Sequence, residues 1–85
     1  MQLPTIHMNG TSKERLIEAL CNASHKLNEA YEALKKTGPN GRDYYPQGPG
    51  AFDRADDEHL VRLRKLDAIK DEIDSLTLAI DGAGE

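Results

Sequence analysis

The chain has 85 residues, a formal net charge of −4 and 38% hydrophobic residues, with tryptophan absent and phenylalanine present once. These values allow one small domain, over residues 1–85, with a core of Leu, Ile and Ala rather than aromatic rings. They argue against a general nucleic-acid binder, which would carry a basic stripe, and against a membrane protein, because no run approaches the roughly 20 apolar residues of a membrane span.

Cysteine occurs once, as Cys21, so an intrachain disulfide is excluded. A single free thiol fits a cytosolic location. The first residues lack the basic start and the apolar stretch of a signal peptide, so we expect none. We therefore expect the protein to act in the cytosol.

The N-terminal half predicts an arm followed by a helix. Residues 1–10 contain proline, asparagine and glycine without a helical period and are expected to be extended. A helix is predicted over 12–37, with Thr11 as its N-cap and Glu14 completing a capping box. Its apolar stripe has the spacing of an amphipathic helix and consists of Leu16, Leu20, Ala23, Leu27, Ala30 and Leu34.

The C-terminal half predicts a loop and a longer helix. Glycine and proline are concentrated in 38–49, the expected loop, and the second helix is predicted over 50–81, with residues 82–85 fraying. Apolar side chains recur every seven residues in it, the spacing of helices that pack side by side. The heptad positions are Phe52, His59, Leu66, Ile73 and Ile80, with Ala55, Ile69 and Leu76 on the adjacent seam.

These elements predict an all-α fold, an antiparallel two-helix hairpin. One hairpin would leave Ile17, Leu60 and Leu78 uncovered, so we expect two to pack into a helical-bundle dimer, or more copies into a higher oligomer. A monomer with scattered exposed apolar residues is the alternative. With the loop at the midpoint of the hairpin, residues whose numbers sum to about 87 lie level, which places His59 beside Asn28.

The predicted loop carries more side-chain chemistry than a turn requires. Arg42 and Asp43 are followed directly by Tyr44 and Tyr45. An arginine fork matches phosphate or carboxylate geometry, and a tyrosine ring offers a stacking face and a phenol donor. These residues therefore suit a nucleotide-like ligand. The alternative is that the two tyrosines cap the open end of the bundle.

Cations are expected around the same loop. Lys35 and Lys36 end the first predicted helix and Arg54 begins the second, so that with Arg42 four cations would lie near one end. The N-terminus of the second helix adds free backbone N–H groups, which favour an anion. Together they would hold the phosphate of a ligand whose base stacks on tyrosine.

Three further polar residues are not explained by packing. His59 occupies a core heptad position, and His7 and Asn9 lie in the arm. A buried polar group needs a partner, so His59 is either paired with Asn28 or in contact with a ligand. The predicted helices keep the histidines apart, and no Ser–His–Asp or Cys–His set is recognisable. We therefore expect no metal, no cofactor and no enzyme.

The stretch TIHMNGTS, a helix, then PNGRDYYPQGP and a second helix with Glu58–His59 early in it resemble a family of short helical proteins of bacteriophage and prophage genomes. The resemblance covers almost the whole chain and implies a phage origin rather than a particular activity. By size and oligomeric helical build, the chain also resembles phage anti-defence sponges, which sequester nucleotide-derived alarm molecules of bacterial immunity without converting them.

The resemblance and the loop together predict a non-enzymatic, phage-encoded protein that sequesters a nucleotide-derived signal in the host bacterial cytosol. The expected partners are that small molecule and further copies of the chain, with no membrane and no polymeric nucleic acid. The expected ligand-binding residues are Arg42, Asp43, Tyr44, Tyr45, Arg54, His59, His7 and Asn9. The alternative is an adaptor or inhibitor that acts on a host or phage protein through its helical face.

Arm and loop are predicted at opposite ends of the first helix, which would be about 39 Å long. They would therefore share a site only across two copies packed in opposite directions.

Overall fold

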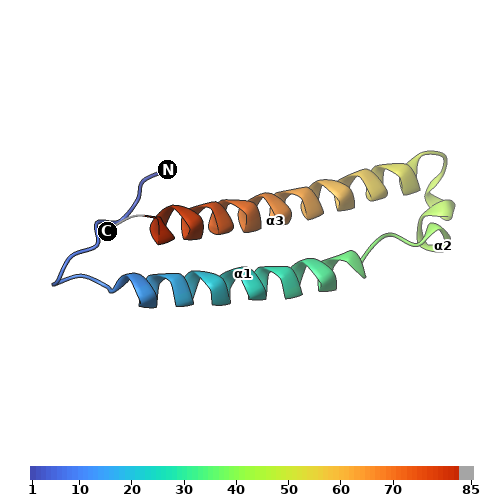
Figure 1. Cartoon of the computed structure of the whole chain (residues 1–85). Helices are drawn as coiled ribbons and strands as arrows, with labels where there is room; N and C mark the ends of the chain where they lie inside the picture. The colour runs from blue at the N-terminus through green and yellow to red at the C-terminus, as the bar shows by residue number, and fades with distance from the viewer. Residues whose placement is uncertain (83–85) are drawn as a thin grey trace.

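The computed structural model describes residues 1–82 and contains only helices as regular elements there, which confirms the all-α part of the predicted fold. The elements in chain order are α1 (Lys13–Lys35), α2 (Gly41–Tyr44), a 3₁₀ turn (Tyr45–Gln47) and α3 (Ala51–Asp81). α1 and α3 run side by side in opposite directions, and α2 lies at one end of the pair (Figure 1). The molecule is elongated, with extents of 62 × 20 × 17 Å.

Local capping sets the start of α1 one residue later than predicted. Ser12 has extended backbone geometry and its side chain accepts a hydrogen bond from the N–H of Arg15 at 3.2 Å. The predicted N-cap, Thr11, therefore precedes the helix, and Glu14 lies in its first turn, where an acidic side chain favours the helix dipole. The helix ends before the Gly38–Pro39 pair, as a proline at this place requires.

The connection is more structured than the predicted loop over 38–49. Asn40 caps α2, since its Oδ1 accepts a hydrogen bond from the N–H of Arg42 at 3.0 Å. Gly48 and Gly50 have φ angles of 99° and 82°, which L side chains rarely adopt, and they turn the chain into α3. The structure thus contains three α-helices among the described residues, and the expected fraying of 82–85 lies largely outside them.

The register between the long helices differs from the predicted one. Ser24 lies opposite Asp74 and Gly38 lies against His59, so the numbers of level residues sum to 97 or 98 rather than 87. The predicted pairing of His59 with Asn28 is therefore wrong, and Asn28 is exposed. The cause is the connection: α2 and the 3₁₀ turn contact the start of α3, which extends roughly 18 Å beyond the last residue of α1.

The core is a single seam between two helices. The leucines of the predicted stripe of α1 are half-buried, as are Leu63, Leu66 and Ile73 on α3. Within residues 1–82, three residues are buried: Ala51, Ile80 and the polar His59. A seam of this kind shields one side of each helix and leaves the flanks of the stripe open to water.

Candidate functional site

The strongest candidate site is the tip of the molecule, formed by α2, the 3₁₀ turn and the first turns of α3 (Figure 1). Asn40 holds the start of α2 with its side chain, and its carbonyl accepts a further bond from the N–H of Asp43 at 3.0 Å. Pro46 lies in the 3₁₀ turn, and the N–H of Gly48 bonds to the carbonyl of Tyr45 at 3.3 Å. The tip therefore has a defined backbone on which its side chains are displayed.

The two adjacent tyrosines have different environments. Tyr44 is half-buried, whereas Tyr45 is 81% exposed. Arg42 and Asp43 are also exposed. Because consecutive helical residues point about 100° apart, one ring packs against the tip while the other faces water. Tyr45 and Arg42 are consequently available for stacking and for pairing with an anion, and Tyr44 has a packing role.

The four cations expected at one end do not form one cluster. Arg54 folds back over the start of α3, with its Nη1 atom 3.3 Å from the place where a Cβ on Gly50 would lie. The register of the helices places Lys36 roughly 12 Å from the level of Arg54 along the long axis. Lys35 pairs with Glu32 at 3.4 Å and lies 5.7 Å from the ring centre of Tyr31. The tip therefore offers Arg42 and Arg54, accompanied by the carboxylates of Asp43 and Asp53.

His59 lies below the tip and is only 7% exposed. Its Nε2 atom would lie 3.4 Å from a Cβ on Gly38, so the ring packs against the chain where it leaves α1. This contact explains why the heptad position tolerates a ring with polar edges: the neighbour is a glycine at the open end of the seam. The structure places His59 on α3 one to two turns after Arg54, beneath the exposed residues.

The arm, residues 1–10, lies at the opposite end of the molecule from α2 (Figure 1), and its residues His7 and Asn9 are exposed. A turn forms here, with the N–H of Gly10 bonded to the carbonyl of His7 at 3.1 Å. The imidazole folds over Gly10, where a Cβ would lie 2.8 Å from its Nε2. Within one chain the predicted site residues thus fall into two groups, six at or below the tip and two in the arm.

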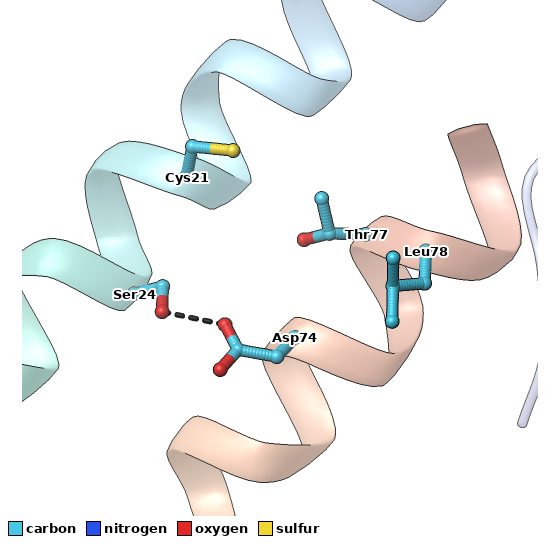
Figure 2. A pocket seen from close by; sticks show the side chains of 5 residues that line it. All are labelled: Cys21, Ser24, Asp74, Thr77 and Leu78. Atoms are coloured by element: carbon cyan, nitrogen blue, oxygen red, sulfur yellow. Dashed lines mark hydrogen bonds between the residues drawn. The ribbon is translucent and has the colours of Figure 1, made fainter.

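A groove that the sequence did not predict lies between α1 and α3 (Figure 2). Its lining residues are Cys21, Ser24, Asp74, Thr77 and Leu78. Ser24 donates a hydrogen bond to Asp74 at 2.5 Å, and Lys70 approaches the other carboxylate oxygen at 3.3 Å. The bond from Ser24, followed by the contact with Lys70, lowers the pKa of Asp74 below its ordinary value of 3.8, although partial burial opposes this.

Both hydroxyl groups of this groove are engaged in hydrogen bonds within the chain. Thr77 donates to the carbonyl of Ile73 at 2.8 Å, and the Ser24 hydroxyl points at Asp74 rather than into the groove (Figure 2). A carboxylate with a lowered pKa is a weak base, so a serine that donates a hydrogen bond to it is not activated as a nucleophile. The sequence signal that could have revealed the contact is the pair of polar residues that flank the two apolar stripes at 24 and 74.

Comparison of the chain with protein-family models, with curated proteins and with solved structures finds no match. In the part of the chain that the structure describes, no helix combines the length and the apolar character needed to cross a membrane. Over the same residues, no three His, Cys, Asp or Glu side chains gather in a way that could hold a metal ion.

Proposed function

We propose that the protein binds and sequesters a nucleotide-derived signalling molecule of bacterial antiphage immunity, without converting it, as a phage-encoded protein in the host cytosol. The observation that carries the proposal is the tip, where Tyr45 is 81% exposed next to an exposed Arg42 on a capped helical turn. A ring that is 81% exposed contributes little to the packing of its own chain. Its value lies in a surface on which a base can stack.

The chemistry of such binding follows from the residue types. The guanidinium of Arg42 would donate two parallel hydrogen bonds to a phosphate, and Arg54 would add a second cation. Asp43 would accept from an amino group or a ribose hydroxyl, as carboxylates do. Sequestration needs no bond to be made or broken, so hydrogen bonding, stacking and charge are sufficient.

The proposed active form is an oligomer of antiparallel helical hairpins. In one chain the arm and the tip lie at opposite ends. A partner that runs the other way would bring its arm to the tip. His7 and Asn9 would then supply polar edges to a ligand held by Arg42 and Tyr45. Two such composite sites would exist in each dimer.

A nucleotide panel in thermal shift tests the proposal. Cyclic dinucleotides, cyclic oligonucleotides and ADP-ribose derivatives are compared with AMP and ATP as controls. A ligand at about 100 times its Kd stabilises the folded state by about 2.7 kcal/mol, which raises the Tm by roughly 10 °C or more for a domain of this size. The same ligand should leave the Tm of Arg42→Ala unchanged. If no nucleotide shifts the wild-type Tm, the proposed function is wrong.

A second candidate function is that of an adaptor or inhibitor of a host or phage protein. The observation that favours it is the exposure of Leu78, 73%, and of Leu60, 40%, on the side of the helices that carries the groove of Figure 2. Exposed leucines on a helix are typical anchors for a protein partner. Loss of activity in Leu78→Ser, with the tip variants fully active, would favour this candidate over nucleotide binding.

A further inference from the structure

The isolated chain exposes more surface than a globular protein of its mass. Its accessible surface is 6507 Å² at 9.4 kDa. A compact monomer of this mass would expose about 5,000 Å², so the excess is about 1,500 Å². Each partner of a standard interface buries about 800 Å². The excess reflects the elongated two-helix shape, and it is large enough for a stable pairing with another chain.

The α1–α3 pair has two broad faces, and the groove of Figure 2 marks one of them. On α3 this side carries Leu60, Arg64, Asp67, Asp71, Asp74 and Leu78, which recur at alternating spacings of four and three residues. We call it the aspartate face. Its two leucines are separated by three carboxylates. A second copy pressed against it would bring together six aspartates and only four cations, two copies each of Arg64 and of Lys70, which already pairs with Asp74. Removing water from so many charges, with carboxylates in excess, is unfavourable.

The other side of α3 is apolar. Leu66, Ile69, Ile73 and Leu76 alternate at spacings of three and four residues, the pattern of a helix that packs into a bundle. Ile69 is 48% exposed although it lies in this pattern, and the other three are half-buried. The seam with α1 therefore covers one edge of the apolar stripe and leaves the other edge open.

α1 continues this apolar side with small residues. Ala19, Ala23 and Ala30 lie on the flank of α1 away from Cys21 and Ser24, because a helix turns by 100° per residue. We call the combined surface the isoleucine face. It consists of Ala19, Ala23 and Ala30 of α1 with Leu66, Ile69, Ile73 and Leu76 of α3. Alanine allows a facing helix to approach closely.

Two ion pairs lie beside the isoleucine face, each within its own helix. Lys26 lies 3.4 Å from Glu29 on α1, and Arg62 lies 3.5 Å from Glu58 on α3. Both pairs are exposed. Arg62 stands four residues before Leu66 on the same side of α3, so its pair with Glu58 ends the apolar stripe, seven residues before Ile69. Covering the isoleucine face therefore buries mainly apolar groups, whereas covering the aspartate face buries mainly charged side chains.

We propose that the isoleucine face binds the same face of a second copy of this chain, which completes a four-helix bundle and buries Ile69 and Leu76. The contact is isologous: a two-fold axis relates the two copies, and both use the same surface. That surface therefore has to be complementary only to itself. The inference rests on the oligomer of the proposed function and assigns the surface through which it forms.

Molar mass in solution, from light scattering at micromolar concentration without any nucleotide, tests the assignment. The wild type should have twice the chain mass of 9.4 kDa. Ile69→Glu and Ala30→Glu should give the mass of one chain, because each places a charge in the centre of the interface. Leu78→Glu is the matched control: it adds the same charge on the aspartate face and should keep the dimer.

Ala30→Glu is included to distinguish loss of the dimer from loss of folding within one chain. Ala30 is exposed within the chain and glutamate is a good helix former, so the substitution disturbs the interface rather than α1. If this variant loses helicity together with mass, both should return as protein concentration rises, since the equilibrium is then with the dimer. Failure of mass and helicity to return on concentration overturns the assignment.

Two further outcomes overturn it: a wild type with the mass of one chain, or a dimer that Leu78→Glu dissociates and Ile69→Glu does not. The result is independent of the nucleotide panel. A dimer on the isoleucine face that binds no nucleotide supports this inference and contradicts the proposed function. A monomer that binds a nucleotide contradicts this inference and supports nucleotide binding.

Discussion

Ser24 of α1 donates a hydrogen bond of 2.5 Å to Asp74 of α3, fifty residues along the chain. Among the hydrogen bonds and ion pairs between side chains of residues 1–82, it is the one that joins the two long helices; the others stay within one helix. Apolar stripes alone tolerate sliding by one heptad, because the pattern repeats. A single bond between a hydroxyl and a carboxylate penalises that slip, so this pair supports the register that the connection sets.

The pair predicts a loss of stability in acid. The pKa of Asp74 is lower in the folded state than its ordinary value of 3.8, so the contribution is fully present above the unfolded pKa and is lost as pH falls through the folded one. The Tm of the wild type, followed by circular dichroism from about pH 6 to pH 2.5, should fall more steeply below about pH 4 than that of Asp74→Asn. Ser24→Ala should flatten the curve in the same way.

Asp71→Asn is the control for this measurement. Asp71 is exposed, so removing its charge should leave the acid-dependent fall of the wild type in place. Equal slopes for wild type and Asp74→Asn would contradict the role of the Ser24 bond.

The helices could be predicted from sequence because their signals are local. The heptad recurrence on α3 and the apolar stripe of α1 specify two amphipathic helices whatever their partners are. The start of α1 was misplaced by one residue because Thr11 and Ser12 are both good caps, and only the hydrogen bond to Arg15 decides between them. Propensity cannot separate two neighbouring hydroxyl residues.

The register could not be predicted because it depends on the connection. Treating 38–49 as a plain loop placed His59 beside Asn28, whereas α2 and the 3₁₀ turn fold against α3 and place His59 against Gly38. Asn40 before a short polar-aromatic run was a readable capping signal for α2. Tyr44 is half-buried and Tyr45 is exposed because of the way that short helix packs. The apolar periodicity of the two long helices could not predict this difference.

The tip should depend on the left-handed backbone of Gly50. Gly50→Ala places a Cβ at a φ of 82° and 3.3 Å from the Arg54 guanidinium, so we expect a loss of about 1–2 kcal/mol. For a domain of this size that lowers the Tm by roughly 4–8 °C for each kcal/mol. Gly41→Ala is the matched control, because nothing lies within 4 Å of its Cβ and alanine favours a helix. Equal Tm values for the two variants would show that Gly50 is not constrained.

The two tyrosines should separate packing from binding. Tyr45→Ala and Arg42→Ala should abolish ligand binding and biological activity while helicity and Tm stay nearly unchanged, because both side chains face water. Tyr44→Ala should lower the Tm, since it removes a half-buried ring. Calorimetry with the ligand found by thermal shift measures the first effect and a melting curve the second. If Tyr45→Ala lowers the Tm by several degrees and the variant still binds the ligand, the tip has a structural role and not a binding role.

The seam between the long helices should not accept a charge. Leu27 is half-buried in the middle of α1, and Leu27→Asp removes its apolar contacts and adds a carboxylate, which should cost about 3 kcal/mol or more. This loss is a large part of the total stability of so small a domain. We therefore expect unfolding, seen by circular dichroism, or dissociation, seen by light scattering. Asn28→Asp adds the same charge to the exposed neighbour and should change little. Retention of the wild-type Tm by Leu27→Asp would contradict the observed seam.

The composite site predicts complementation between copies. Asn9→Ala damages the arm and Arg42→Ala damages the tip, and in one chain the arm and the tip lie at opposite ends of the molecule. A dimer formed from one copy of each variant has one site with both parts intact and one with both damaged. Random exchange gives half heterodimers, so about a quarter of all sites should bind ligand again in calorimetry.

Mixing Arg42→Ala with Tyr45→Ala is the control, because every site then contains a damaged tip and binding should stay absent. Exchange of subunits is verified in both mixtures by native mass spectrometry. If exchange is complete and the first mixture binds no more than the second, the arm of one copy does not reach the tip of its partner. Arg42 and Tyr45 would then have to bind the ligand without His7 and Asn9, and each tip would be a complete site in itself.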